Sequence, residues 1–289
     1  MSSNKTAVIT GSNAGIGFET ALALAKMNYK VLLLCRNEQK ASEAVEALKQ
    51  KSGNADIGHV VADLSSKEDI AAAAKNISLQ FDHLDALVNN AGIWLSERTL
   101  NKDGIEVQFA VNHLAPFLLT HLLLPLLLKS DDARIVNVNS DTHFRGKIDF
   151  NDLTLSKGYN GIKSYAHSKL SNCLFTYELD RKLKQKGIQN MAVNALQPGL
   201  VKTDIGFKHT FSLHALVWKI RREFGVTPEE GAKTSVYLAT APELKGISGL
   251  YWDKCASKPS SKNSYIEADA QKMWAISKEM CGIADFFVV

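Results

Sequence analysis

The 289-residue sequence predicts a single α/β domain, a doubly wound parallel sheet of about seven strands with helices on both faces. Short apolar runs alternate with longer helical segments along most of the chain, which is the element order of a parallel sheet. The runs are continuously apolar, as expected for strands buried on both faces. Glycine-rich or polar residues follow most of them, and in a parallel sheet such residues meet at one edge, where ligands bind.

Composition excludes several classes of protein. The chain is 45% hydrophobic and 22% charged, which is typical of a globular domain. Its net charge of +4 comes from scattered basic residues, so no nucleic-acid partner is expected. The longest apolar run, Phe117 to Leu128, is too short to span a bilayer, and we expect no transmembrane anchor.

Cysteine and histidine usage gives two further expectations. His209 and His214 are five residues apart and lack partner ligands, so no metal site is predicted. The cysteines lie far apart, and no signal peptide precedes them. This usage predicts reduced thiols and a cytoplasmic location. The cysteines are Cys35, Cys173, Cys255 and Cys281.

The first predicted strand, residues 5–10, leads into a glycine-rich turn and a helix at residues 18–27. This order presents backbone N–H groups and the positive end of a helix to a phosphate. A plain connecting loop is the alternative, because the spacing Gly-x-x-x-Gly-x-Gly departs from the common dinucleotide fingerprint. The cofactor-binding residues predicted here are Gly11, Ser12, Asn13, Gly15, Ile16 and Gly17.

The second predicted strand, residues 31–34, carries the signal for the type of cofactor. It ends at Cys35, and Arg36 and Asn37 follow as predicted cofactor contacts. An acidic residue at this position binds a ribose 2′-hydroxyl, whereas an arginine accommodates a 2′-phosphate. The sequence therefore favours NADP over NAD, with a plain surface arginine as the alternative.

The third and fourth predicted strands also end in candidate cofactor contacts. Asp63 and Leu64 follow the strand at residues 57–62, and Ser65 or Ser66 is the predicted cap of the next helix. The strand at residues 84–88 runs into two asparagines, an alanine and a glycine, which either form a turn or allow close approach to a cofactor. The predicted contacts there are Asn90, Ala91 and Gly92.

The second half of the chain continues the alternation. A long helical region at residues 104–128 contains Asn112 and, four residues later, Pro116, so we expect Asn112 to serve a purpose other than helix stability. Ser140 follows the fifth strand, residues 134–138, and a polar insert at 142–162 leads to a helix at 165–186. Within the insert, His143, Phe144 and Tyr159 are predicted as surface turn residues, with a place lining the substrate pocket as the alternative. The remaining elements are strands at 191–196 and 247–252 and helices from Thr227 and up to Ile283.

Tyr165 and Lys169 are the strongest catalytic candidates. Positions four apart lie on one side of a helix, so the phenol and the ammonium can approach each other. A nearby cation lowers the pKa of a phenol from about 10, which suits general acid–base catalysis. A solvated helix face is the alternative for this short pattern, and the other motifs decide between the two.

Together these motifs resemble those of the short-chain dehydrogenase/reductase family, over nearly the whole chain. The resemblance rests on Thr-Gly-x-x-x-Gly-Ile-Gly at 10–17, Asn-Asn-Ala-Gly at 89–92, Ser140, Tyr165-x-x-x-Lys169 and Pro198-Gly199. The residues at 35–37 and 167–170 and the long insert between Ser140 and Tyr165 most resemble those of the retinol-dehydrogenase-like branch. The resemblance implies one Rossmann-type NADP-binding domain over residues 1–289.

The family pattern also implies roles for individual residues. Ser140 would hold the carbonyl oxygen, and Tyr165 would give it a proton while the nicotinamide supplies hydride. Lys169 would bind the nicotinamide ribose and depress the pKa of Tyr165, and Asn112 would support a proton relay behind Lys169. Further cofactor contacts implied by the family are Pro198, Gly199, Val201 and Thr203. One departure is Asn139, where a second serine is usual; because Ser140 is retained, we expect activity to survive.

A segment near residues 204–226 is expected to cover the substrate. It carries an apolar stripe opposite basic residues, which predicts a packed helix, a lid over an apolar substrate or contact with a membrane surface. The predicted activity is therefore NADP(H)-dependent interconversion of an apolar carbonyl and its alcohol, with retinal as one candidate. Two alternatives are a silent NADP-binding sensor and a nucleotide-sugar dehydratase or epimerase. The family also implies a homodimer or homotetramer paired through helices 104–128 and 165–186.

Overall fold

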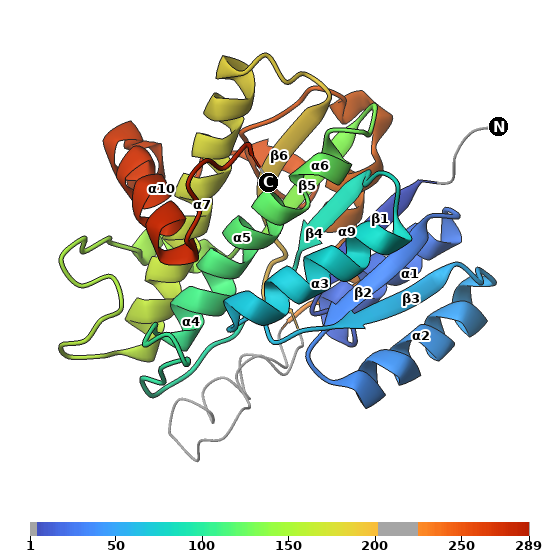
Figure 1. Ribbon diagram of the computed structural model, residues 1–289, viewed down its shortest axis with the longest axis horizontal. Coiled ribbons are helices and arrows are strands. Elements are labelled where there is room, and N and C mark those ends of the chain that lie inside the picture. Colours follow the sequence, from blue (N-terminus) through green and yellow to red (C-terminus); the bar gives the residue numbers. More distant parts are fainter. Residues whose placement is uncertain (1–4, 202–224, 289) are drawn as a thin grey trace.

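A computed structural model describes residues 5–201 and 225–288 of the chain. Its centre is one sheet with the strand order β3-β2-β1-β4-β5-β6-β7-β8 (Figure 1). All neighbouring strands pair in parallel except β7 and β8, which are antiparallel. The strands are β1 (Thr6–Thr10), β2 (Lys30–Cys35), β3 (Ile57–Val61), β4 (Ala86–Asn89), β5 (Ala133–Val138), β6 (Met191–Gln197), β7 (Tyr251–Asp253) and β8 (Ala256–Lys258).

The predicted fold class is confirmed, with one strand more than the seven expected. The additional strand, β8, is joined to β7 by a two-residue turn in which Lys254 and Cys255 both have positive φ, 50° and 59°. Hairpin turns of this kind favour asparagine and glycine. A Lys-Cys pair gives no such signal, so the sequence did not indicate this hairpin.

Helices cover both faces of the sheet (Figure 1). Side chains of α1 (Gly15–Lys26), α2 (Glu38–Ser52) and α9 (Pro228–Thr240) pack in one apolar core with the sheet. Those of α3 (Lys67–Gln80), α5 (Ala115–Leu122) and α7 (Gly161–Gln185) pack in a second core with the sheet. Three short 3₁₀ helices complete the described elements, Asp141–Arg145, Pro242–Leu244 and Lys262–Tyr265.

The region predicted as one helix at 104–128 is divided into four pieces. These are α4 (Val107–Phe109), a π-helical turn (Ala110–Leu114), α5 and α6 (Leu124–Leu127). Glu106 starts the region by accepting hydrogen bonds from two backbone N–H groups of α4. Pro116 cannot donate a hydrogen bond to the carbonyl four residues earlier, and the wider π-helical turn lies just where this bond is lost. The turn contains Asn112.

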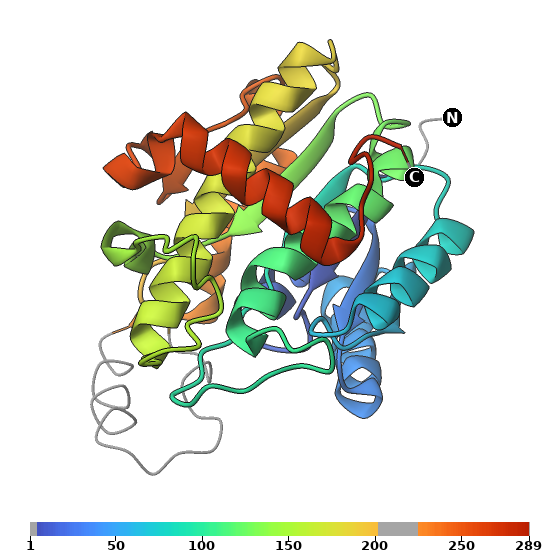
Figure 2. The same cartoon turned by 60° about the vertical axis from the view of Figure 1, so that its left-hand side comes forward.

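The C-terminal helix α10 (Glu267–Cys281) lies across α5 and α7 (Figure 2). Trp274 of α10 and Phe286 of the following segment both pack against Phe117 of α5, with ring centroids 5.0 and 4.9 Å away. Every residue of α7 from Ala166 to Asp180 is buried within the chain. Among the described residues, these helices are largely covered from within the chain, and the expected pairing with a second subunit stays a prediction.

Two further sequence-based expectations concern the segment near residues 204–226 and the absence of a transmembrane anchor. The predicted substrate-covering segment lies mostly outside the described residues, as does Thr203. Within the described residues, no helix combines the length and the apolar character needed to cross a membrane.

Candidate active site

The glycine-rich turn between β1 and α1 is held against the end of β4. Nδ2 of Asn90 donates hydrogen bonds to the carbonyl oxygens of Thr10 and Gly11, at 2.8 and 3.1 Å. A Cβ atom at Gly17 would lie 2.5 Å from this same nitrogen, so only glycine allows the approach. The structure thus brings together the predicted residues of two separate strands.

The same turn leaves the start of α1 open to a ligand. Gly11 and Gly15 both have positive φ, a backbone conformation that glycine adopts without strain. Ala14 occupies the N-cap and offers no side-chain hydrogen bond to the first N–H groups of the helix. Uncapped N–H groups at a helix start favour an anion, so the geometry fits the phosphate site expected from the sequence.

The tip of β2 places Arg36 on the surface. Its side chain is exposed, directly after the buried Cys35. Asn37 is the N-cap of α2, because its side chain accepts a hydrogen bond from the N–H of Lys40. Glu38 begins α2, as the sequence predicted, and bonds His59 of β3 at 2.8 Å.

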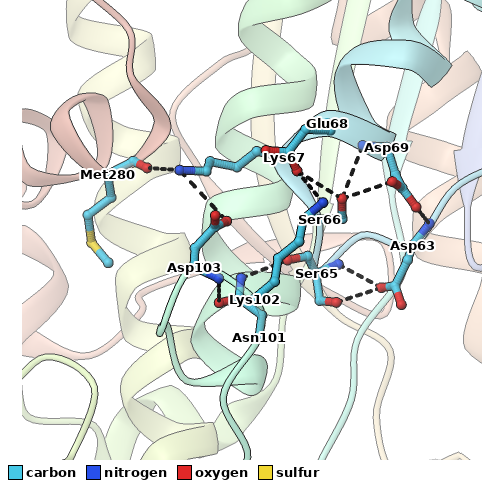
Figure 3. Close-up of polar contacts among 10 residues, drawn as sticks. All are labelled: Asp63, Ser65, Ser66, Lys67, Glu68, Asp69, Asn101, Lys102, Asp103 and Met280. Carbon is cyan, nitrogen blue, oxygen red and sulfur yellow. Dashed lines mark hydrogen bonds and ion pairs between the residues drawn. The ribbon is translucent and has the colours of Figure 1, made fainter.

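Asp63, after β3, lies in a compact polar loop (Figure 3). Its Oδ1 accepts hydrogen bonds from the backbone N–H and the hydroxyl of Ser65, both at 2.8 Å. Ser66 caps α3, which confirms the predicted helix start. Asn101 reaches this loop from another part of the chain and donates to the carbonyl oxygen of Ser65 at 2.7 Å. The loop is therefore supported by residues just before the π-helical turn.

Tyr165 and Lys169 lie in the first half of α7, with Lys169 almost completely buried. Lys169 Nζ donates to the carbonyl oxygen of Val138 at 3.0 Å and lies 5.6 Å from the centre of the Tyr165 ring. A Cβ atom at Gly92 would lie 3.4 Å from Nζ, so the predicted residues of β4 and α7 meet.

Burial is the largest influence on the pKa values of Tyr165 and Lys169. It raises the pKa of Tyr165 to about 12, against a smaller lowering by the hydrogen bond from Ser140, and it lowers the pKa of Lys169 to about 8. Burial outweighs the causes that lower the pKa of Tyr165 in this structure, and the expected depression by Lys169 stays a prediction. The Lys169 ammonium donates to the Val138 carbonyl, and burial is the largest influence on the phenol. Tyr165 is held in the protonated form that donates a proton.

Asn112 joins this group from the π-helical turn. Its Oδ1 accepts from the N–H of Ile93 at 2.8 Å, and its Nδ2 donates to the Ile93 carbonyl and to Ser168 Oγ, both at 3.0 Å. Ser168 itself donates to the carbonyl oxygen of Tyr165. Asn112 thus connects the segment that follows β4 to the turn of α7 that carries Tyr165 and Lys169.

Ser140 has its polar atoms occupied by close neighbours in the chain. Its Oγ accepts from the N–H and the hydroxyl of Thr142, at 3.2 and 2.8 Å. Its N–H donates to Asn139 Oδ1, and its carbonyl oxygen lies 2.7 Å from His143 Nδ1. With both lone pairs of Oγ engaged, the hydroxyl hydrogen is left to donate, and the hydroxyl is close enough to Tyr165 to lower the pKa of the phenol.

Comparisons with known proteins agree with this arrangement. A family model described as short chain dehydrogenase matches residues 5–210. The chain belongs to the short-chain dehydrogenase family. Members of this family use a nicotinamide cofactor, and the chain is an oxidoreductase that acts on CH–OH groups.

The relatives of this dehydrogenase place it in the retinol-dehydrogenase-like branch. It is 40% identical to retinol dehydrogenase 14 of Mus musculus over 96% of this chain and 86% of the relative. It is also 40% identical to retinol dehydrogenase 12 of Bos taurus, over 96% and 87%. An uncharacterised protein from Mycobacterium paratuberculosis has the same fold, with a TM-score of 0.75, 28% identity and coverage of 96% and 94%.

The insert of the dehydrogenase contains one residue that the sequence misplaced. His143 was expected at the surface, yet it is completely buried. Both of its ring nitrogens have hydrogen-bond partners in the protein, which allows this burial. Phe144 is 48% exposed, as expected. Tyr159 is half-buried, and its hydroxyl is bonded to Gln108 and Glu106. A histidine three residues after Ser140, in a polar insert, gives no periodic signal from which its burial could be predicted.

The residues after β6 are described only in part. Pro198 and Gly199 follow the strand, and Gly199 has a φ of 80°. Val201 is buried against α9, where a Cβ atom at Gly231 would lie 2.7 Å from its side chain. Among residues 5–201 and 225–288, no group of three or more potential ligands is arranged to hold a metal ion.

Proposed function

We propose that this dehydrogenase interconverts an apolar carbonyl compound and its alcohol with NADP(H). The observation that carries the proposal is the buried Lys169, whose Nζ lies 5.6 Å from the centre of the Tyr165 ring, with Ser140 close enough to lower the pKa of this tyrosine. The three side chains come from two different elements and meet at the carboxyl edge of the sheet. Such an arrangement positions a carbonyl oxygen and protonates it.

Each residue has a separate task in the proposed reaction. Ser140 donates its free hydroxyl hydrogen to the carbonyl oxygen of the substrate. Tyr165 transfers its proton to the same oxygen in reduction, and recovers one in the reverse direction. Lys169 places a positive charge near the resulting phenolate, and Asn112 holds the turn of α7 through Ser168. When bound, NADPH supplies the hydride for the carbonyl carbon.

The proposed cofactor is NADP(H) and not NAD(H). The open start of α1 fits a pyrophosphate, and the exposed Arg36 fits a 2′-phosphate at the end of β2. Asn37 follows Arg36 directly, and Asp63 follows the neighbouring strand β3. A short-chain dehydrogenase from Escherichia coli CFT073 with the same fold was solved with NADPH; it has a TM-score of 0.68 and 24% identity, covering 87% of this chain and 97% of that one.

The proposed substrate is apolar. Phe144, four residues after Ser140, and Ile162, three residues before Tyr165, expose 48% and 42% of their surface. Exposed apolar side chains on both segments that carry catalytic residues favour a lipophilic partner. The names of the retinol dehydrogenases to which the chain is similar make retinal one candidate. We extend the proposal to a reducing, cytosol-like compartment, in keeping with four free cysteines.

The test measures NADPH oxidation with all-trans-retinal, decanal, a steroid ketone and a small quinone, with NADH in parallel. We expect turnover of at least one apolar carbonyl with NADPH, reduced at least a hundredfold in Tyr165→Phe while NADPH still binds. Tight NADPH binding without turnover of any probe would favour a sensor instead. Better turnover with NADH would contradict the assigned cofactor.

A further inference from the structure

Asn139 stands between the last residue of β5 and the catalytic Ser140. The side chain is 3% exposed, and all of its polar atoms are engaged. Its Oδ1 accepts a hydrogen bond from the N–H of Ser140 at 2.8 Å. Its Nδ2 donates to the carbonyl oxygen of Lys169 at 3.0 Å and to Cys173 Sγ at 2.9 Å. One planar amide therefore touches the backbones of two catalytic residues.

This amide is the middle one of three consecutive contacts between β5 and α7. Before it, the carbonyl oxygen of Val138 accepts from Lys169 Nζ. After it, the Ser140 hydroxyl lies close enough to Tyr165 to lower the pKa of the phenol. The contacts of Val138 and Ser140 involve the reacting side chains, which must adjust when substrate and cofactor bind. The contact of Asn139 involves only backbone atoms and Cys173, so it can persist throughout the reaction.

We propose that Asn139 is a positioning residue that fixes the distance between Ser140 and the catalytic turn of α7. An amide carries its acceptor and its donors on opposite sides of a rigid group, so it can hold both backbones at once. A serine hydroxyl has a single hydrogen and a shorter reach, and it cannot replace both sets of contacts. Displacements of about 1 Å in an active site reduce rates by as much as about a hundredfold.

The experiment compares Asn139→Leu and the milder Asn139→Ser with a matched control, Asn194→Leu. Asn194 is also 3% exposed and lies on β6, but its amide bonds Ile247, Leu250 and Trp252, away from the catalytic residues. The first readout is amide-hydrogen exchange of the full-length chain without substrate. The second is the separation of kcat from the KM for NADPH, with all-trans-retinal and decanal as probes.

The exchange measurement tests the proposed contact without any reaction. We expect faster exchange in residues 140–146 and 165–173 for both Asn139 variants. For Asn194→Leu we expect it only around residues 247–252. Exchange in 140–146 and 165–173 that matches the unaltered protein, or that rises equally in the control, would overturn the proposal.

The kinetic measurement tests what the Asn139 contact does for catalysis, and it rests on the proposed function. We expect kcat to fall about tenfold or more in Asn139→Leu and less in Asn139→Ser, with the KM for NADPH within about twofold. An unchanged kcat in both variants would overturn the positioning role. If the unaltered protein turns over neither probe, the proposed function fails, and the exchange comparison still decides whether Asn139 joins the two segments.

Discussion

His143 Nδ1 lies 2.7 Å from the carbonyl oxygen of Ser140, and His143 Nε2 accepts a hydrogen bond from the N–H of Ser261 at 3.0 Å. A carbonyl oxygen only accepts and a backbone N–H only donates, so Nδ1 carries the hydrogen and the ring is neutral. Burial accordingly lowers the pKa of His143. The ring joins the loop after Ser140 to the chain that leads into α10.

We therefore expect His143→Leu to lower both stability and activity. Two buried hydrogen bonds are lost, which should reduce the free energy of unfolding by about 2 kcal/mol. Ser140 also loses support at its carbonyl oxygen, so kcat should fall about tenfold. Chemical denaturation and NADPH oxidation measure the two effects. His83→Leu is the control, since His83 precedes β4 at the opposite edge of the sheet, and kcat there should change less than twofold.

Two further buried histidines predict a loss of stability in acid. His113 and His167 pack against Phe109, and each has one ring nitrogen without a hydrogen-bond partner among the described residues. Burial lowers their pKa values to about 3 and about 4. The unfolded chain, with a histidine pKa near 6.5, then binds more protons than the folded one, so stability falls as pH drops below about 6.5.

The expected effect is about 2 kcal/mol for each of these two histidines at pH 5 relative to pH 7, from the linkage between protonation and folding. Urea denaturation between pH 5 and pH 7.5 measures it. In His113→Gln the change with pH should be smaller by about 2 kcal/mol, the contribution of this histidine. A free energy of unfolding that is constant over this range in the unaltered protein would contradict the prediction.

The sequence predicted the fold because its signals are local. Buried parallel strands need continuous apolar runs, and the turn at Gly11–Gly17 needs glycine for reasons of backbone geometry. Apolar runs mark the predicted strands, and glycines stand at positions 11, 15 and 17. The four catalytic candidates also lie together, because the carboxyl ends of parallel strands meet at one edge.

The sequence failed where a contact depends on residues far apart in the chain. The burial of His143 is set by Ser261, more than a hundred residues later, and the raised pKa of Tyr165 by packing around the phenol. The cover of α7 by α10 depends on Trp274 and Phe286, whose positions on the surface of the domain no local pattern specifies. In the sequence, Asn139 stands out only as a departure from the family pattern. Its contacts could not be predicted, because they depend on how α7 packs against β5.

The lowered pKa of Lys169 predicts how activity depends on pH. With a pKa of about 8, the ammonium loses its proton within the range in which the enzyme can be assayed. We expect kcat/KM for NADPH, which reports groups of the free enzyme, to fall as pH rises through about 8. Lys169→Arg should be less active but should lack this decline, because guanidinium stays charged. A decline of the same shape in Lys169→Arg would assign it to another group.

Arg36 gives the sharpest test of cofactor choice. Its side chain is exposed at the tip of β2, where it can form charge-assisted hydrogen bonds to a 2′-phosphate. Hydrogen bonds of this kind contribute about 1.5–3 kcal/mol, so Arg36→Ala should raise the KM for NADPH by about tenfold to a hundredfold. NADH has no 2′-phosphate, so its KM should change less than twofold. Steady-state kinetics with both cofactors measures the difference.

The control for Arg36 is another exposed cation on the same side of the sheet. Lys51 lies in the last turn of α2, the helix whose first turn follows Arg36, and contacts the ring of Phe18. Lys51→Ala removes one positive charge from this face without touching the tip of β2. If both variants weaken NADPH equally, the effect comes from net charge and Arg36 does not recognise the phosphate. A loss confined to Arg36→Ala and to NADPH requires a direct contact, because a general change in the electrostatic field would act on both cofactors.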